Sequence, residues 1–402
     1  MKLFKSLLIA PATLGLLAPL SATATEVNLN DISNYSDVDT IDFANSFNKK
    51  DLNENSLLAG GEGLVESHSH DSSFSGTTTA SFSADMYLGS VDGGDHQPTT
   101  DKPVEKSSTM AGYSFQIDLN TSFTGEDSLD VSLDAGNSGA TGTAEFDGNT
   151  GGDGLSVDGV SYTFPIGDKA TAFVGDNTDG SLLFTTACVY GGPSNTLDDC
   201  GNGYTAINSG GGTAFGASYD FGNGFTSAFG VTTSGSTADG VLTAEGDDAY
   251  AINAAYTADN YGVSLTFADK EAPAAGITES TFWALNAYYT PTADGMPSIS
   301  AGYETAESDV VTVVDDVDSS HWFVGLSWDE VGPGTAGVAV GTKQHTLDID
   351  GEAFEEMLMY EAYYSYDIND GMSVTPLVFV KENAVSGVDD ETGVMVKTSF
   401  AF

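Results

Sequence analysis

The sequence contains no arginine, and its 11 basic residues, all lysines, face 59 acidic ones across 402 residues, giving a formal net charge of −48. A surface of this sign repels nucleic-acid phosphates, so nucleic-acid binding is excluded. The absence of arginine also removes bidentate clamps for phosphate or carboxylate groups from the available chemistry. Only 17% of the residues are charged and 48 are glycine, an unusual balance for a cytosolic enzyme.

Long hydrophobic runs are also missing beyond the N-terminus. Lys2 and Lys5 precede an apolar stretch that ends at the small-residue site Ala22-Thr23-Ala24, the pattern of a secretory signal peptide over residues 1–24. A membrane anchor is the alternative, although Pro11, Gly15 and Pro19 interrupt the stretch. No later segment approaches the roughly 18 apolar residues that a membrane-spanning helix needs. If the mature chain spans a membrane, it must do so as a closed barrel.

The mature chain divides into two parts. Residues 25–76 are polar and acidic and predict a linker or a small remnant domain without a packed core. From residue 77 to residue 402 apolar and polar residues alternate with a period of two, which indicates strands. One clear hairpin joins Ala111–Leu119 to Leu129–Ala135, and the pattern recurs about sixteen times.

The connections between these strands alternate between long and short, as in transmembrane barrels with long outer loops and short periplasmic turns. Apolar faces such as Tyr250, Ile252, Ala254 and Tyr256 fit a lipid-facing band with aromatic girdles. A soluble β-sandwich also has strands with one apolar and one polar face, but its connections do not alternate regularly between long and short. We therefore predict an all-β fold, an antiparallel transmembrane barrel of about 16 strands. The chain ends on Phe402, which we expect to act as an assembly signal.

Three segments resemble cyanobacterial outer-membrane porins of the carbohydrate-selective-porin-like, or iron-uptake porin, family. They are the signal peptide, the stretch Tyr113–Gly125 (YSFQIDLNTSFTG) and the loop Ala187–Asn202 (ACVYGGPSNTLDDCGN). The resemblance implies a homotrimer in the cell outer membrane that passes inorganic ions, iron species or small sugars. Members carry an S-layer-homology domain that tethers the barrel to peptidoglycan. Here Ile32–Asp39 resembles its opening, but residues 25–76 are too few for a complete domain, which puts the tether in doubt.

The two cysteines, Cys188 and Cys200, lie close together in the longest connection of an exported chain, so we expect a disulfide. In many sixteen-stranded porins the third outer loop folds into the lumen, and this connection is the third long one. The disulfide then stiffens a constriction. The alternative is a disulfide that only protects an exposed loop.

The polar faces of the predicted strands carry more acidic than basic residues, which predicts a cation-preferring pore. The alternative is that these acids keep an exported protein soluble or bind divalent ions that bridge lipids. The predicted pore-lining residues are Asp85, Asp118, Asp130, Asp134, Asp220, Glu304, Asp329, Glu361, Asp367, Lys343, Lys381 and Lys397.

Other motifs are weaker. Glu66–Asp71 places His68 and His70 between carboxylates, a loose metal-binding pattern in a linker, and Asp153–Gly159 resembles a single calcium-binding glycine repeat. There is no nucleophile elbow or phosphate loop, so we expect no enzyme, no cofactor and no metal. The sequence thus predicts a porin for passive diffusion of small hydrophilic solutes, in contact with outer-membrane lipid. The alternative is a secreted acidic β-rich adhesin or cell-surface structural protein.

Overall fold

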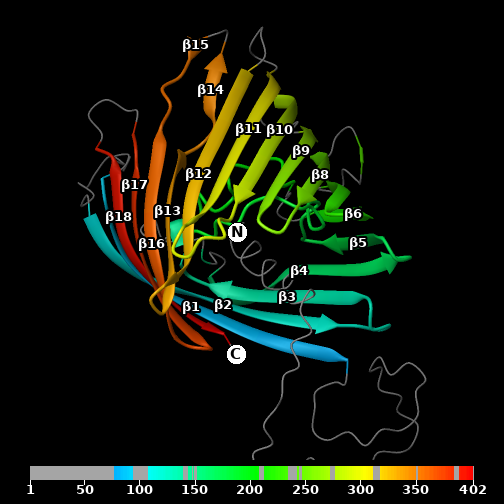
Figure 1. Cartoon of the computed structure of the whole chain (residues 1–402), viewed down its shortest axis with the longest axis horizontal. Helices are drawn as coiled ribbons and strands as arrows, with labels where there is room; N and C mark the ends of the chain where they lie inside the picture. The colour runs from blue at the N-terminus through cyan, green and yellow to red at the C-terminus, as the bar shows by residue number, and fades with distance from the viewer. Residues whose placement is uncertain are drawn as a thin grey trace, which may run out of the picture. The chain divides into compact units, whose positions relative to one another are not determined.

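The computed structural model describes residues 77–93, 107–138, 144–146, 148, 152–207, 212–233, 242–243, 247–271, 277–310, 317–349, 352–383 and 389–401. These residues form one antiparallel sheet of strands that closes on itself (Figure 1). The first nine strands are β1 Thr78–Asp92, β2 Ser107–Thr121, β3 Ser128–Gly136, β4 Gly152–Ile166, β5 Ala170–Asp176, β6 Thr213–Gly222, β7 Phe225–Thr233, β8 Asp248–Thr257 and β9 Tyr261–Glu271. The other nine are β10 Ile277–Tyr289, β11 Ser298–Val310, β12 Val317–Val331, β13 Gly334–Thr342, β14 Thr346–Ile349, β15 Glu352–Ala353, β16 Leu358–Asn369, β17 Met372–Lys381 and β18 Glu391–Ala401. A short 3-10 helix, η2 Ala144–Phe146, lies in the connection between β3 and β4.

Closure of the barrel is given by β1, which pairs with β2 on one side and with β18 on the other. Each strand otherwise pairs with its neighbours in sequence, except that β13 pairs directly with β16. The short strands β14 and β15 form a hairpin beyond the end of β13, and β14 extends the edge of β12 at residues 317–320. Without these two, sixteen strands of the described residues close the barrel. The predicted sixteen-strand antiparallel barrel is confirmed, and the predicted hairpin of Ala111–Leu119 with Leu129–Ala135 is formed by β2 and β3.

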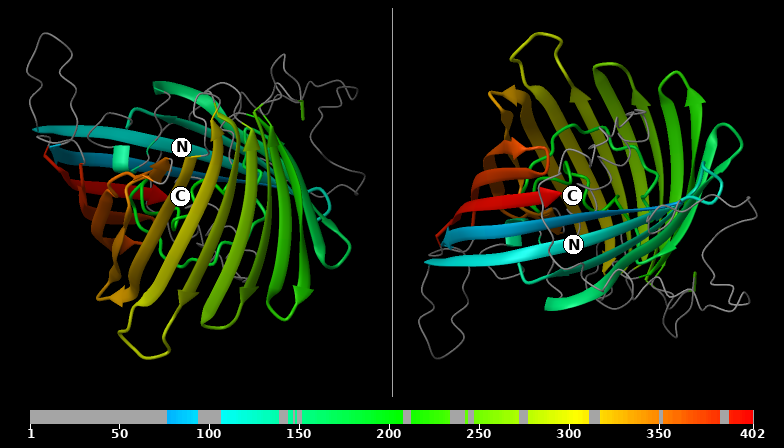
Figure 2. Two further views of the ribbon diagram at one scale, coloured as in Figure 1. Left: turned by 90° about the horizontal axis from the view of Figure 1, so that it is seen from above. Right: turned by 90° about the horizontal axis from the view of Figure 1, so that it is seen from below.

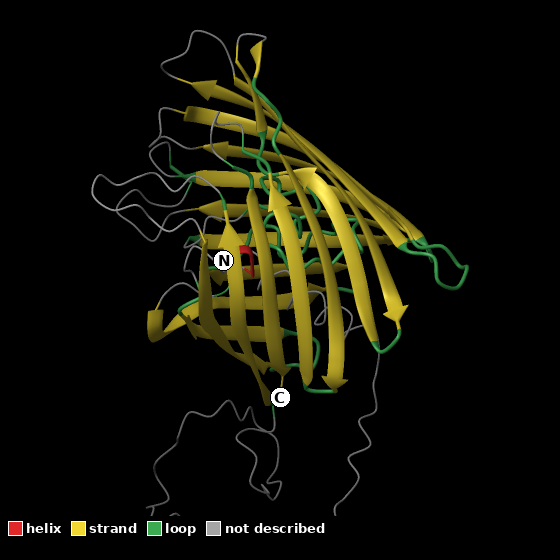
Figure 3. Ribbon diagram, turned by 90° about the vertical axis from the view of Figure 1, so that its left-hand side faces the viewer, coloured by secondary structure: helices red, strands yellow, loops and turns green. Residues whose placement is uncertain are grey.

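Long and short connections alternate along most of the barrel, as predicted, but the β10–β11 connection, residues 290–297, is longer than the β9–β10 and β11–β12 connections beside it. Figure 3 shows short turns that join neighbouring strands at one end of the barrel. The turn between β6 and β7 is built by Asn223 and Gly224, with φ angles of 54° and 84°. Positive φ at two successive residues is what a two-residue hairpin turn of the favoured type requires, and Asn-Gly supplies it at little cost.

Another short turn, between β2 and β3, is organised by Asp127. Its carboxylate accepts hydrogen bonds from the backbone N–H groups of Phe123 (3.0 Å) and Thr124 (2.7 Å) and from the hydroxyl of Tyr162 (2.7 Å). The bond from Tyr162, aided by those of Thr124 and Ser122, holds the pKa of Asp127 well below its usual range. The carboxylate therefore stays ionised and fixes the turn.

The outer face of the barrel carries an apolar band between two rows of aromatic residues. Along β8, for example, Tyr250 and Ile252 are exposed while Ala251 and Asn253 are buried. The row at the long-loop end contains Tyr250, Trp283, Tyr303 and Tyr360, and the row at the short-turn end contains Tyr219, Phe221, Tyr261, Tyr289 and Tyr366. Paired aromatic girdles around an apolar band are the outer surface of a membrane-spanning barrel. Among the described residues, no helix is long and apolar enough to cross a membrane.

Candidate functional site

The third long connection, residues 177–212, is called loop 3 below, and its described residues 177–207 lie inside the barrel (Figure 2). Its backbone is held by side chains of the inner wall. The N–H of Gly180 donates to Thr232 on β7 (2.9 Å), and the N–H of Ala187 donates to Ser264 on β9 (2.9 Å). The expectation that this loop folds into the lumen therefore agrees with the structure.

Loop 3 lies so close to the wall that only glycine fits at two contact points. A Cβ atom on Gly230 of β7 would come within 1.7 Å of the carbonyl oxygen of Gly180, and one on Gly302 of β11 within 1.8 Å of that of Cys200. Nearby inner positions also carry small side chains, such as the buried Ala251 and Ala284. The small residues of β7 to β11 thus form a seat for the loop backbone.

Glu304 on β11 anchors the returning half of loop 3. Its fully buried carboxylate accepts hydrogen bonds from the backbone N–H groups of Tyr204 (3.1 Å) and Thr205 (2.9 Å) and from the Thr205 hydroxyl (2.8 Å). His345 approaches the same carboxylate with Nε2 at 2.8 Å, and its ring stacks on His321 with centroids 5.6 Å apart. A buried carboxylate needs several such partners, and here most of them belong to the loop.

A second anchor joins loop 3 to β16, which follows β11, β12 and β13 in the barrel wall, and there the Tyr190 hydroxyl donates to Glu361. Burial, followed by the negative charge of Glu361, raises the pKa of Tyr190, so its hydroxyl remains a donor over the physiological range. The backbone N–H of Tyr190 also donates to Ser300 on β11 (3.1 Å). Loop 3 is therefore tied to strands from β7 through β16.

The disulfide between Cys188 and Cys200 is present, with a Cα–Cα distance of 6.5 Å. It joins the outgoing and returning halves of loop 3, and Cys200 is buried in the barrel interior. The backbone carbonyl of Cys200 accepts a hydrogen bond from Asn286 on β10 (2.9 Å). Of the two roles considered from the sequence, a cross-link inside the barrel fits this position, and protection of an exposed outer loop does not.

The inner wall is not polar throughout, which the sequence reasoning missed. Buried apolar residues from β1, β12 and β16 to β18 form one cluster with loop 3 and η2. Its members include Tyr87, Phe146, Tyr190, Leu197, Phe323, Met359, Leu377, Phe379 and Met395. The sequence signal is the loss of alternation in Pro376–Val380 on β17, where both faces are apolar. This cluster fills one side of the barrel interior.

Helix η2 packs on the part of the barrel interior that this apolar cluster fills. Glu145 contacts the Nζ of Lys381 on β17, and its backbone carbonyl accepts the N–H of Asn195 in loop 3 (2.8 Å). Phe146 packs on Tyr87 of β1, with ring centroids 5.4 Å apart. Lys381, predicted as pore-lining, is thus engaged in an ion pair that fixes η2 to the end of β17.

The acidic residues on β2 and β3 face the interior on another part of the wall. Asp118 accepts from Ser132 (2.7 Å), Asp130 from Asn120 (2.5 Å) and Asp134 from Ser156 on β4 (2.9 Å). These bonds run between neighbouring strands, whereas the inner positions of β7 to β11 are used to hold loop 3. The structure therefore brings three of the predicted pore-lining acids together on one stretch of wall.

The remaining predicted residues are more scattered. Asp85 is buried beside the hydroxyl of Tyr87 (3.3 Å), and Lys397 is buried on the adjacent β18. Asp220, Asp329 and Asp367 lie near short turns, and Asp220 accepts the N–H of Gly222 (2.7 Å). Lys343 follows the end of β13, with Nζ 3.5 Å from the carbonyl of Glu382.

Three other sequence motifs have different outcomes. Asp153–Gly159, which resembled a calcium-binding repeat, is part of β4, and Asp153 accepts the hydroxyl of Tyr113 (2.9 Å). The segment with His68 and His70 and the terminal Phe402 lie outside the described residues. Within the described part of the chain, no group of three or more His, Cys, Asp or Glu side chains is arranged to hold a metal ion.

Replacement of Glu304 by glutamine is expected to loosen loop 3. The amide can accept fewer hydrogen bonds and carries no charge, so the N–H groups of Tyr204 and Thr205 lose part of their support, at a cost of about 1 to 3 kcal/mol. Hydrogen exchange should show faster exchange at residues 202–207 and unchanged protection in β2 and β3. Glu307→Gln, on the outer face of the same strand, is the control and should leave loop 3 protected. Equal protection in both variants would contradict the anchoring role.

No protein-family model matches the sequence, and no curated protein matches it. Solved structures do match. OprB from Pseudomonas putida gives a TM-score of 0.58 at 11% identity over 81% of this chain and 94% of that chain. An anion-selective porin from Comamonas acidovorans gives 0.55 at 14% identity over 81% and 99%. The trimer form of OmpT, an outer membrane protein of Vibrio cholerae, gives 0.55 at 11% identity over 81% and 100%. At these identities the similarity establishes a common barrel fold.

Proposed function

We propose that this chain is an outer-membrane porin that passes small hydrophilic solutes, preferentially cations, by passive diffusion. The observation that carries the proposal is the asymmetric interior. Loop 3 is fixed against β7 to β12 and β16, while Asp118, Asp130 and Asp134 lie on the wall formed by β2 and β3. A narrowed lumen with carboxylates on its wall favours cations over anions. In this mechanism the width of the lumen and the charge on its wall decide which solutes pass, and no catalytic residue is required.

The basis for a cation preference is the imbalance of charge on the inner wall. The chain has no arginine. Lys381 is paired with Glu145, which cancels one of the few inward positive charges. One porin with a similar fold is described as anion-selective, so the fold leaves selectivity open and the side chains decide it.

The proposal extends to the whole chain. Residues 1–24 serve as the signal peptide, residues 25–76 as an acidic linker or truncated S-layer-homology-like segment, and residues 77–402 as the barrel domain. Membership of the cyanobacterial carbohydrate-selective-porin-like family is part of the proposal and keeps small sugars and iron species as alternative cargo. A homotrimer is proposed by the same resemblance, and a neighbour of the same fold is described in a trimer form.

Planar-bilayer recording tests the function directly. The purified chain should give stable conductance steps and a reversal potential of cation-selective sign under a KCl gradient. An anion-selective potential would overturn the charge assignment of the lumen and retain the channel. Absence of conductance from protein that shows the heat-dependent gel mobility of a folded barrel would overturn the porin and favour the adhesin.

A further inference from the structure

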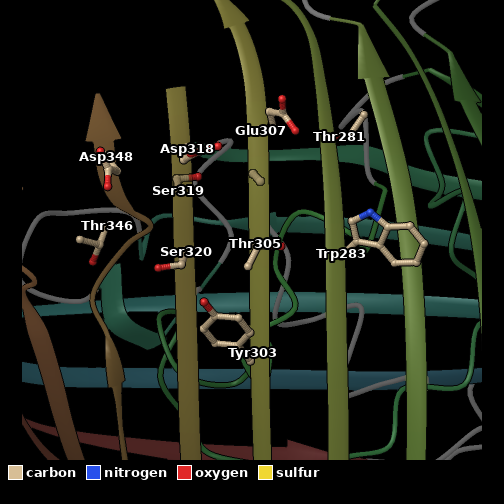
Figure 4. Close-up of a pocket in the computed structure, with 11 residues that line it drawn as sticks. Thr281, Trp283, Tyr303, Thr305, Glu307, Asp318, Ser319, Ser320, Thr346 and Asp348 are labelled. Atoms are coloured by element: carbon tan, nitrogen blue, oxygen red, sulfur yellow. The ribbon is translucent and has the colours of Figure 1, made fainter. Parts of the chain in front are cut away.

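A cavity of about 400 Å³ lies on the wall formed by β10, β11, β12 and β14 (Figure 4). The alternation of these strands places it on the outer surface of the barrel. Trp283 and Tyr303 line the cavity and are half exposed, whereas their neighbours Phe282 and Glu304 are buried inside the barrel. The cavity is therefore separate from the lumen.

The lower part of the cavity is aromatic. Trp283 and Tyr303 belong to the row of aromatic residues at the long-loop end of the apolar band. The indole of Trp283 also packs on Phe267 of β9, with ring centroids 4.9 Å apart, which restrains its orientation. Figure 4 shows the Tyr303 ring below the polar side chains and the Trp283 indole at the level of Thr305, with which Trp283 is paired across β10 and β11. These two rings offer apolar surface at the level of the membrane interface.

The upper part of the cavity is polar and acidic. The register places Glu307 opposite Asp318, and Asp318 opposite Asp348, so three carboxylates follow one another across β11, β12 and β14. One row closer to the membrane, the hydroxyls of Thr305, Ser320 and Thr346 follow one another in the same way. Neither row contains a basic side chain, and none lines the cavity.

The hairpin of β14 and β15 completes this wall. At residues 343–345 the chain leaves the register of β13, and His345 contacts Glu304 inside the barrel. The chain then pairs again with β12 as β14, which returns Thr346 and Asp348 to the outer face. Without β14 the cavity would lack one of its sides.

The chemistry of the cavity selects its ligand. Carboxylates and hydroxyls side by side accept and donate hydrogen bonds to a polyhydroxylated ring, and an aromatic face packs against the C–H groups of such a ring. Three carboxylates without a basic residue repel a phosphate. Leu285 and Val324, exposed on β10 and β12, continue the surface into the apolar band, where acyl chains lie.

We propose that this cavity binds the uncharged or amino-bearing sugar headgroup of a membrane glycolipid. The sugar ring rests on Trp283 and Tyr303, its hydroxyls or amine contact the Thr305 to Thr346 row and the carboxylates above it, and its acyl chains follow the apolar band. A glycolipid fits better than a free sugar because the cavity opens on the outer wall of the barrel, directly above that band.

Native mass spectrometry of the detergent-purified full chain tests this inference. Monogalactosyl diacylglycerol and phosphatidylglycerol with the same acyl chains are added in equal amounts. The galactolipid should be retained preferentially, and Trp283→Leu should weaken its retention by about tenfold, as expected for the loss of one aromatic platform. Asp318→Asn should weaken it less. Tyr250→Leu is the matched control, since Tyr250 belongs to the same girdle on β8 and is 50% exposed against 51% for Trp283.

Three outcomes would overturn the inference. They are equal retention of phosphatidylglycerol, unchanged galactolipid retention in Trp283→Leu, and complete displacement of the lipid by millimolar methyl β-galactoside, which would identify a free-sugar site. All variants are first checked for the heat-dependent gel mobility of a folded barrel. Since the cavity lies outside the lumen, Trp283→Leu should conduct like the unmodified chain, and a failure of the channel proposal would leave the lipid measurement interpretable.

Discussion

Replacing Asp118, Asp130 and Asp134 together by asparagine is expected to remove most of the cation preference of the channel. The three carboxylates lie on adjacent strands of one stretch of inner wall, and asparagine keeps their size and part of their hydrogen bonding. Their loss removes three negative charges from the lumen. The reversal potential under a KCl gradient should move at least about halfway to zero, and more at low salt, where the Debye length is greater.

The matched control removes three charges from the outer surface. Glu307→Gln, Asp318→Asn and Asp348→Asn together change the net charge by the same amount, but these side chains line the cavity on the outer wall. Their effect on the reversal potential should be small. If both triple variants shift the potential equally, selectivity comes from the overall charge of the chain. If neither does, the carboxylates of β2 and β3 do not face the path of the ions.

The strands could be predicted from the sequence because each has one face turned to the barrel interior and one turned outward, so the residue type changes at every second position. On β8 and β9 outward residues such as Tyr250, Ile252 and Leu265 alternate with small or polar inward ones, and in the middle of both strands the structure buries every second residue. The tight turns were also predictable, because Asn223-Gly224 carries its own turn geometry. Strand ends were predicted too short, since β2 covers Ser107–Thr121 and the predicted strand only Ala111–Leu119. The added residues Ser107, Ser108 and Thr109 are polar, so the alternation of apolar and polar residues does not reach them.

The candidate site was predictable only in part. The alternation of faces places Asp118 and Asp130 inside, but it cannot show that Glu304 and Glu361 are used to hold loop 3. These roles depend on partners more than 90 residues away in sequence, such as Thr205 for Glu304. The same holds for His321 and His345, which carry no local motif. The apolar cluster could have been found from β17, where the residues on both faces are apolar. It was missed because the inner face of every strand was assumed to be polar.

Removing most of loop 3 is expected to raise the single-channel conductance by about two- to fivefold, because the loop occupies lumen that ions would otherwise use. The two ends of the loop already meet, since the N–H of Asn177 donates to the carbonyl of Gly212 at 2.9 Å. A short glycine-serine linker in place of residues 180–207 can therefore join β5 to β6 without distorting them. Planar-bilayer recording measures the conductance, and gel mobility confirms that the barrel folds.

The deletion should keep the cation preference, because Asp118, Asp130 and Asp134 remain on the wall. Cys188→Ser with Cys200→Ser is the milder companion variant. Glu304, Glu361 and Ser300 still hold the loop without the disulfide. The mean conductance of the double-serine variant should therefore stay near that of the unmodified chain, while its current becomes noisier. A deletion variant that conducts no better than the unmodified chain would show that the narrowest point lies elsewhere. Lost selectivity in that variant would instead place the selecting charges on loop 3 itself.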